Sequence, residues 1–262
     1  MNTNTPPTPG DSYVQSFARG LAVIRSFSAE APQQTLSEVA ARTGLTRAGA
    51  RRILLTLQTL GYVESDGKQF RLTARILELG FAYLSSMPIW DLAEPVMEGL
   101  VEQVRESCSA AVLDGTEIVY VLRLHTHKIM RTTLGVGSRL PAYCTSLGRM
   151  LLAGLPDAEL EQRLRASDLR QHTRHTVTDI PTLMSLIRQA RTQGWCLVNQ
   201  ELEEGLISVA APLTNRAGQT VAALNISGQA NRTSAEVMQA SLLPALLAAA
   251  QAISRMLGTQ RG

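Results

Sequence analysis

The fold is constrained most by residues 35–72, TLSEVAARTGLTRAGARRILLTLQTLGYVESDGKQFRL, which predict a helix, a tight turn, a second helix and a short hairpin. Thr35 and Glu38 form a T-x-x-E capping box, which satisfies free amides at a helix start. Gly44 closes this first helix, and Thr46 caps the second. These signals together predict a helix-turn-helix unit.

A hairpin is predicted directly after the second helix. Tyr62–Glu64 and Gln69–Leu72 alternate like strands around the turn signal Ser65–Gly67, and Lys68 lies at the hairpin tip. Two helices and a ribbon with positive charge on the outer face form a shape that fits the DNA major groove. The segment therefore predicts a winged helix-turn-helix.

The excess positive charge of the chain lies in its first third. Residues 1–86 hold nine Lys or Arg and six Asp or Glu, whereas the remainder holds sixteen of each, so the formal net charge of +3 belongs to the first part. Within residues 46–75, six basic residues stand against two acidic ones. This balance is typical of a polyanion-binding face, because arginine forks onto phosphates and guanine edges. A solvated helix face is the alternative that charge alone leaves open.

Candidate DNA contacts follow from the direction of the second helix. A recognition helix enters the groove with its N-terminal residues nearest the base edges, and the free amides there favour phosphate. Its apolar residues would face inward: Ala50, Ile53, Leu54, Leu57 and Leu60. The candidates are therefore Thr46, Arg47, Ala48, Gly49, Arg51, Arg52 and Lys68.

The termini and cysteines predict a cytoplasmic protein. Residues 1–11 lack the basic start and apolar run of a signal peptide, and their Thr, Pro and Asn content predicts a disordered tail. No uninterrupted apolar run reaches the ~18 residues of a membrane span. The widely spaced Cys108, Cys144 and Cys196 fit reduced thiols.

The expected domains are a winged helix-turn-helix at 12–73, mostly α with a β-hairpin wing, a linker helix at 74–87, and an α+β domain at 88–258. Strands in the last are expected at Ala110–Leu113, Ile118–Leu122, Ile129–Leu134, Ile207–Leu213 and Val221–Ile226. Helices are expected at Ile89–Glu106, Cys144–Ala153, Asp157–Arg165, Pro181–Thr192 and after a capping box of Thr233 and Glu236. A sheet with helices on its flanks accounts for this order.

No constellation of residues predicts catalysis, a metal site or a cofactor. The pairs His125/His127 and His172/His175 lack the spacing of a structural zinc site. Cys144 lies near a predicted helix start but has no local histidine partner. We therefore expect that the chain is not an enzyme.

Several segments resemble one known family: VQSFARGLAVIRSF, LSEVAARTGLTRAGARRIL, GVGSRLPAYCTSLGRMLLAGL, NQELEEGLISVAAPL and AALNISGQANRTS. Over all but the N-terminal tail, the chain is similar to IclR-type bacterial transcription regulators. SFARGLAVIRSF and LGVGSRLPAY most resemble the branch that controls the β-ketoadipate (protocatechuate and 4-hydroxybenzoate) catabolic genes. The resemblance implies a GAF-like effector-binding fold for the second domain.

The resemblance also implies a pocket for a small effector, where the helix after the LPAY-type loop meets the ends of central strands. The matching positions are Ser146, Leu147, Val198, Asn199, Leu206, Ser208, Asn225 and Ser227. They mix apolar walls with hydroxyl and amide groups, as small-molecule pockets do, although Ser208 and Ser227 fit ordinary strand positions equally well. A carboxylate effector needs a cation, and Arg139 and Arg149 are nearest in sequence.

As function, the resemblance implies a homodimer or dimer of dimers that binds a palindromic double-stranded DNA operator and allows contact with RNA polymerase. A small aromatic acid or dicarboxylate (protocatechuate, 4-hydroxybenzoate or β-ketoadipate class) would change the affinity or spacing of the DNA-binding heads. Two alternatives stay open. One is a winged-helix protein regulated by protein contacts without a metabolite, and the other is an enzyme with an appended DNA-binding domain.

Overall fold

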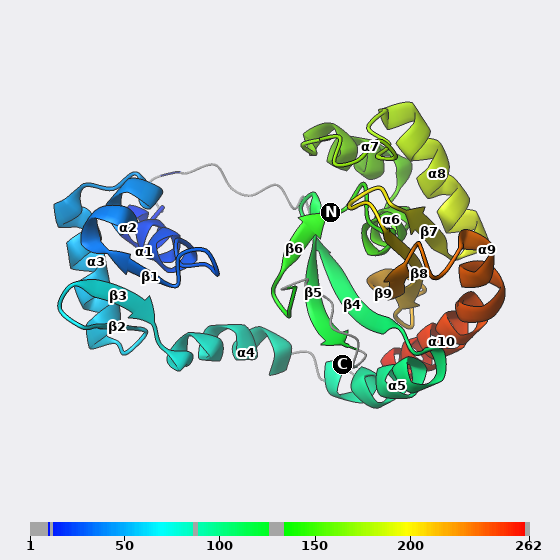
Figure 1. The fold of residues 1–262 in the computed structure, drawn as a ribbon, viewed down its shortest axis with the longest axis horizontal. Helices are drawn as coiled ribbons and strands as arrows, with labels where there is room; N and C mark the ends of the chain where they lie inside the picture. The colour runs from blue at the N-terminus through cyan, green and yellow to red at the C-terminus, as the bar shows by residue number, and fades with distance from the viewer. Residues whose placement is uncertain (1–9, 11–12, 86–88, 126–133, 260–262) are drawn as a thin grey trace. The chain divides into compact units, whose positions relative to one another are not determined.

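The computed structural model describes residues 10, 13–85, 89–125 and 134–259 of the chain. The chain divides into two compact units, Met1–Tyr83 and Leu84–Gly262 (Figure 1). The two units have separate hydrophobic cores. The predicted strand Ile129–Leu134 lies outside the described residues except at its last position, and so does nearly all of the predicted tail.

The first unit is built from helices and a small sheet. Its helices are α1 (Gln15–Arg25), α2 (Leu36–Thr43) and α3 (Arg47–Thr59). Its strands are β1 (Gln33–Thr35), β2 (Val63–Ser65) and β3 (Gln69–Leu72). They pair antiparallel in the order β1-β3-β2, so the predicted hairpin is present and gains a third strand from a segment without strand periodicity.

Local hydrogen bonds set the ends of α2 and α3. The Thr35 hydroxyl accepts from the Glu38 amide, and the Glu38 carboxylate accepts from the Thr35 amide at 2.7 Å, which completes the predicted capping box. Gly44 ends α2 in the left-handed region at φ 66°. Thr46 Oγ1 then accepts from the Gly49 amide at 3.1 Å and starts α3. The turn between the helices therefore follows from these few residues.

The core of the first unit comes from one face of each helix together with β2: Val23, Val39, Ala40, Ala50, Leu54, Leu57 and Val63. Leu60 was predicted to face inward, but it is 51% exposed because α3 ends there and the residue serves as its C-cap. The expected linker helix begins with the 3₁₀ turn η1 (Ala74–Ile76) and continues as α4 (Leu77–Ser85).

The second unit is centred on a six-stranded antiparallel sheet in the order β6-β5-β4-β9-β8-β7. The strands are β4 (Ser107–Asp114), β5 (Glu117–Leu124), β6 (Arg139–Pro141), β7 (Cys196–Asn199), β8 (Leu206–Thr214) and β9 (Thr220–Gln229). The sequence patterns do not predict β6 and β7, because these short edge strands are defined by pairing with a neighbour more than by their own composition.

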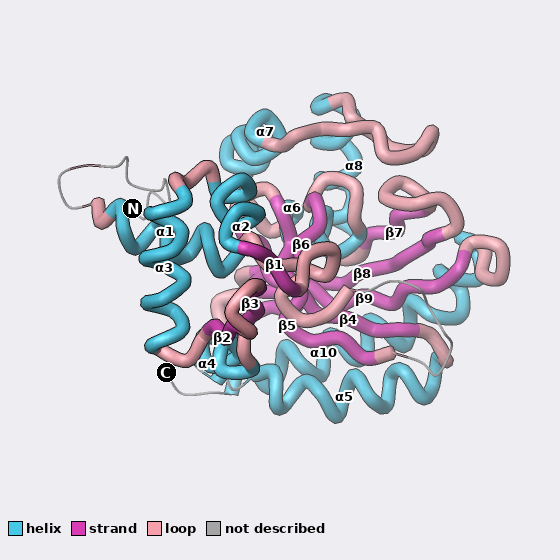
Figure 2. Tube along the Cα trace, turned by 60° about the vertical axis from the view of Figure 1, so that its left-hand side comes forward, coloured by secondary structure: helices cyan, strands magenta, loops and turns pink. Residues whose placement is uncertain are grey.

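Helices cover both faces of this sheet (Figure 2). One face carries α5 (Ile89–Val104) and α10 (Leu243–Thr259), and the other carries α6 (Ser146–Ala153), α7 (Asp157–Ala166) and α8 (Ile180–Gln193). Strand alternation divides the two cores: Val209 and Ala211 of β8 face α10, whereas Ala210 faces α6. The sheet therefore separates two independent layers of side chains.

The last helical region begins with α9 (Ala235–Val237) and a π-helical turn η2 (Met238–Leu242). Ser234, not Thr233, caps α9 through its hydroxyl, so the predicted capping box of Thr233 and Glu236 is wrong. By length and composition the stretch Ala235–Gly258 could cross a membrane. Its Leu246 and Ile253 are, however, fully buried in the core against the sheet, as in a core helix of a globular domain.

Candidate functional site

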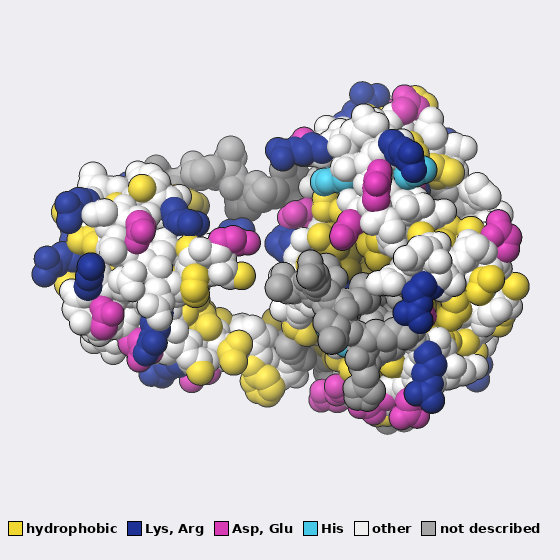
Figure 3. Space-filling view, in the orientation of Figure 1, with side chains coloured by type: hydrophobic (Ala, Val, Ile, Leu, Met, Phe, Trp, Pro, Cys, Tyr) yellow, Lys and Arg dark blue, Asp and Glu magenta, His cyan; other side chains and the backbone are white. Residues whose placement is uncertain are grey.

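The start of α3 presents a polar and basic surface. Its exposed residues are Thr46, Arg47, Ala48, Arg51 and Arg52, with Gly49 partly buried among them. Within the described ranges, no ion pair or side-chain hydrogen bond engages the three guanidinium groups. Basic side chains gather over the part of the unit where α3 lies (Figure 3). This surface is therefore available to a polyanion.

The wing tip is held by Asp66. Its carboxylate accepts from the amides of Gln69 at 2.7 Å and Lys68 at 2.9 Å, and these bonds lower the pKa of Asp66. Gly67 takes a φ of 94°, which a residue with a side chain rarely adopts. The Lys68 side chain is exposed beside this turn, so the tip offers one cation on a fixed backbone.

Two other basic residues of this region are used within the domain. Arg71 forms an ion pair with Glu64 at 2.6 Å. Arg75 donates to the carbonyl of Leu60 at 2.9 Å and lies over the ring of Tyr62. Of the six basic residues within 46–75, the four on α3 and at the wing tip therefore have side chains with no internal partner among the described residues: Arg47, Arg51, Arg52 and Lys68.

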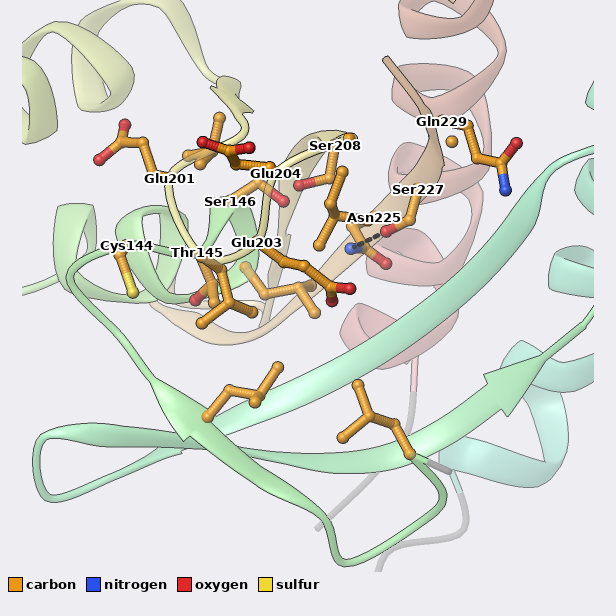
Figure 4. A pocket seen from close by; sticks show the side chains of 18 of the residues that line it. Cys144, Thr145, Ser146, Glu201, Glu203, Glu204, Ser208, Asn225, Ser227 and Gln229 are labelled. Atoms are coloured by element: carbon orange, nitrogen blue, oxygen red, sulfur yellow. Dashed lines mark hydrogen bonds between the residues drawn. The ribbon is translucent and has the colours of Figure 1, made fainter. Parts of the chain in front are cut away.

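A cavity of about 570 Å³ opens on the α6 face of the six-stranded sheet (Figure 4). Its walls come from β5, β8 and β9, from the start of α6, and from the loop of residues 200–205 between β7 and β8. Small-molecule sites measure about 300–1,000 Å³. The cavity therefore has the size of a ligand site.

A β-bulge in β5 places two side chains on the cavity wall. Ala111 pairs with Tyr120 whereas Ala110 pairs with Leu122, so β5 carries one extra residue. Strict alternation would send residues three apart to opposite faces, but the bulge lets both Tyr120 and Arg123 line the cavity. The Arg123 guanidinium carbon lies 5.2 Å from the centre of the Tyr120 ring, a cation–π distance.

Three buried polar atoms of the cavity lining have no hydrogen-bond partner in the described part of the chain: Arg123 Nε, Ser146 Oγ and Asn225 Oδ1. The amide nitrogen of Asn225 donates to Ser227 Oγ at 2.9 Å, so it is the amide oxygen that stays unpaired (Figure 4). A buried polar atom without a partner costs about 1–3 kcal/mol. The cavity is thus suited to a ligand that supplies the missing bonds.

The start of α6 adds backbone donors to the cavity. Thr145 Oγ1 accepts from the Gly148 amide at 3.2 Å, and the Thr145 carbonyl accepts from the Arg149 amide. The amides of Ser146 and Leu147 have no backbone acceptor within the described residues, and both residues line the cavity. Such free amides form the positive end of a helix dipole.

Most of the predicted effector-site residues meet at this cavity: Ser146, Leu147, Val198, Leu206, Ser208, Asn225 and Ser227. Asn199 is exposed at the end of β7 and does not line it. The two arginines proposed for a carboxylate also lie elsewhere. Arg139 pairs with Asp114 and Glu117, each at 2.8 Å, and Arg149 pairs with buried Glu201 at 2.6 Å. The cation on the cavity wall is Arg123. Regular alternation along β5 would place its side chain on the other face of the sheet, and only the bulge brings it to the cavity.

In the described part of the chain, no cysteine at or near the cavity is an activated nucleophile. Cys144 lines it, and burial raises the pKa of its thiol to about 12. Burial likewise raises the pKa of the Cys196 thiol to about 11. Among the described residues, no cluster of three His, Cys, Asp or Glu could hold a metal ion. The groups that remain are suited to binding.

Comparison with known proteins gives two family matches. Residues 16–67 match the IclR helix-turn-helix domain, and residues 81–255 match the bacterial transcriptional regulator IclR C-terminal domain. The first covers α3 and β2 and ends before β3, and the second covers every strand of the six-stranded sheet.

Individual relatives agree with these matches. The Pca regulon regulatory protein of Pseudomonas putida is 41% identical over 251 residues, which cover 95% of this chain and 86% of the relative. The crystal structure of a putative transcriptional regulator from Rhodococcus sp. is 49% identical with a TM-score of 0.85, covering 94% and 98% of the two chains. An IclR homolog from Microbacterium hydrocarbonoxydans, crystallised with 4-hydroxybenzoate, is 27% identical with a TM-score of 0.81, covering 92% and 98%.

The shared architecture accounts for both surfaces described above. A helix-turn-helix with a small β-sheet wing binds DNA, and the α+β domain with its curled antiparallel sheet is an effector-binding domain. Proteins of this kind are transcription regulators and not enzymes. The chain belongs to the IclR family of bacterial transcriptional regulators.

Proposed function

We propose that this regulator is a cytoplasmic homodimer or dimer of dimers that binds a palindromic operator and controls genes for aromatic-acid catabolism through the β-ketoadipate pathway. Its effector would be a small aromatic acid or a dicarboxylate of the protocatechuate, 4-hydroxybenzoate or β-ketoadipate class. The observation that carries the effector proposal is the cavity on the α6 face, whose unpartnered buried polar atoms fit a small polar ligand.

The DNA-binding part of the proposal rests on α3 and the wing. Arg47, Arg51 and Arg52 are exposed without internal partners in the described ranges, and Lys68 stands at the wing tip. Guanidinium groups pair with phosphate and with guanine edges, while the helix start favours phosphate. We assign base and phosphate contacts to this surface, which also includes Thr46, Ala48 and Gly49.

The effector class is supported by relatives. The 41%-identical protein of Pseudomonas putida is named for the Pca regulon, and a structural neighbour was crystallised with 4-hydroxybenzoate. Such acids carry carboxylate and hydroxyl or keto groups that suit Ser146, Ser208 and Asn225 on the cavity walls. These three residues, with Leu147, Val198, Leu206 and Ser227, form the proposed effector site.

The oligomer is supported by exposed apolar side chains in the helices of the first unit and the linker. Phe17 in α1 is 68% exposed, and Leu77 and Phe81 in α4 are 70% and 67% exposed. Large exposed apolar side chains at neighbouring helical positions mark protein interfaces. A two-fold dimer would present two α3 helices to the two halves of a palindrome.

Binding of the acids to the full-length protein tests this function. Protocatechuate, 4-hydroxybenzoate and β-ketoadipate are each added in a thermal unfolding assay, and the acid that is the effector raises stability by about 2.7 kcal/mol at 100 times its Kd. Ser208→Val replaces a buried hydroxyl of the cavity wall and should abolish the shift, whereas Ser185→Val, at an exposed position of α8, should not.

DNA binding is measured in parallel, by mobility shift with the region upstream of the protein's own gene. We expect the acid that binds to change operator affinity. Operator binding without a response to any of the acids would instead favour regulation by protein contacts.

A further inference from the structure

We propose that Arg123 anchors a second carboxylate, so that the cavity takes a linear dicarboxylate held between Arg123 and the start of α6. This inference rests on the proposed function and narrows its effector class. Arg123 is then the residue that determines specificity between dicarboxylates and monocarboxylates.

The first end of the cavity is Arg123. Of the residues that line the cavity in the described ranges, Arg123 is the one cation. Its Nε is buried and without a hydrogen-bond partner among the described residues, and its guanidinium lies over the ring of Tyr120. The ring restrains the guanidinium without neutralising it. A carboxylate supplies an acceptor for this Nε and a negative charge for the guanidinium.

The second end is the start of α6. Ser146 and Leu147 line the cavity there, and their amides have no backbone acceptor within the described residues. The hydroxyl of Ser146, a residue only 1% exposed, also has no partner in that part of the chain. Amides and a hydroxyl at the positive end of a helix favour an anion. The two ends therefore offer separate sites for negative charge.

The register of the sheet sets the distance between Arg123 and the α6 side of the cavity. Arg123 pairs with Ser109 on β4, and Ser109 pairs with Asn225 on β9, so Arg123 and Asn225 share one face two strands apart. Neighbouring strands are about 4.8 Å apart, which separates the two backbones by roughly 10 Å. The helix α6 packs on β8 and β9, and Ser146 lies with Ser208 on that side of the cavity (Figure 4). One carboxylate cannot neutralise both ends, whereas the two carboxylates of a short chain can.

Three acidic residues also line the cavity, Glu201, Glu203 and Glu204, but they do not remove this preference. Glu201 is already paired with Arg149. Glu203 and Glu204 are exposed residues of the loop between β7 and β8, where water and salt screen their charge. An aromatic acid with one carboxylate would leave one positive end without a counter-charge.

Calorimetric titration of the full-length protein with adipate and hexanoate tests the inference, because these six-carbon acids differ by one carboxylate. The wild-type protein should bind adipate at least about tenfold more tightly than hexanoate or 4-hydroxybenzoate. Arg123→Gln should weaken adipate about ten- to one-hundredfold, leave hexanoate nearly unchanged and so remove the preference.

Matched variants separate the two ends. Arg139→Gln removes the same charge from the neighbouring strand β6, outside the cavity, and should keep the preference. Ser146→Ala should weaken both acids by similar factors, because either acid places a carboxylate at α6. If Arg123→Gln lowers the melting temperature, Arg123→Lys replaces it in the test. Lysine keeps the positive charge but cannot form two parallel hydrogen bonds to a carboxylate, so it should weaken the binding of adipate and not that of hexanoate.

Two results would overturn the inference. One is tighter binding of 4-hydroxybenzoate than of adipate by the wild-type protein, and the other is an unchanged adipate-to-hexanoate ratio in Arg123→Gln. In both cases an acid still binds, so the proposed effector function survives. If none of the acids binds the wild-type protein, the inference and the proposed effector class fail together.

Discussion

The guanidinium of Arg149 in α6 donates a 2.6 Å hydrogen bond to the carboxylate of Glu201 in the loop between β7 and β8. Their side chains are only 3% and 9% exposed. Arg149 Nε also donates to the Tyr143 carbonyl at 2.8 Å, and the Glu201 carboxylate accepts from the Val177 amide at 3.1 Å. The pair therefore joins separate chain segments at one wall of the cavity.

Arg149→Ala should lower the free energy of unfolding by about 3–5 kcal/mol, because it leaves the charge of Glu201 buried and unpaired. Urea unfolding at neutral pH measures the loss. The double variant Arg149→Met with Glu201→Leu removes both charges and should be less destabilised than Arg149→Ala. A loss below about 1 kcal/mol in Arg149→Ala would mean that the pair behaves as a surface ion pair.

Gly148→Ala should destabilise the second unit by about 1–3 kcal/mol. A Cβ at Gly148 would overlap backbone atoms of Ala142, including its carbonyl oxygen, so α6 would have to move away from the loop before it. Gly99→Ala in α5 is the control, since nothing lies within 4 Å of its Cβ position, and it should stabilise by about 0.5–1 kcal/mol. Equal melting temperatures of the two variants would refute the close approach at α6.

Arg47→Ala and Arg51→Ala should each weaken binding to random-sequence duplex DNA and reduce the slope of log K against log salt by about 0.9. Each substitution removes one cation from the exposed start of α3. Fluorescence anisotropy at several salt concentrations gives the slope. Arg216→Ala, an exposed arginine between β8 and β9, removes the same charge and should leave the slope unchanged. An unchanged slope in both α3 variants would exclude this surface.

Asp157→Asn should destabilise the protein at neutral pH but not in strong acid. Arg191 and Arg188 donate to the Asp157 carboxylate at 2.8 and 2.9 Å, and these bonds lower its pKa below the ordinary 3.8. Because the pKa of Asp157 is lower in the folded state than in the unfolded state, the carboxylate stabilises the fold at pH values above its unfolded pKa. This stabilisation is lost as the pH falls through the pKa of the folded state.

Melting temperatures of the wild-type and Asp157→Asn proteins should therefore differ above about pH 5 and converge once the pH has fallen through the lowered pKa of Asp157. The exposed change Glu98→Gln in α5 is the control. A difference between Asp157→Asn and wild type that grows toward acid would contradict the assignment.

The helix-turn-helix could be predicted from sequence because its signals are local. Thr35, Gly44 and Thr46 act on amides or backbone angles within a few residues of themselves, so no distant contact has to be known. The same holds for the Asp66–Gly67 turn of the wing. Of the ten positions predicted for an effector site, chiefly from the family resemblance, seven line one cavity.

The remaining features depend on contacts between distant segments. The strand β1 exists because Gln33–Thr35 pairs with β3, and its own sequence has no alternating pattern. The bulge that sends Arg123 to the cavity arises from the pairing of β5 with β4. The sequence does not show that Arg149 is already paired, because its partner Glu201 lies 52 residues further along the chain. Such relationships are decided by tertiary packing, which local periodicity does not report.

Alternation along β8 and β9 has a consequence for how such regulators diversify. Val209 and Ile226 belong to the layer against α10, while Ser208 and Asn225 point into the cavity from neighbouring positions. A substitution in the second set changes the chemistry offered to a ligand while the first set keeps the scaffold folded. A few point mutations in the second set can therefore change which ligand the domain binds while every intermediate variant still folds.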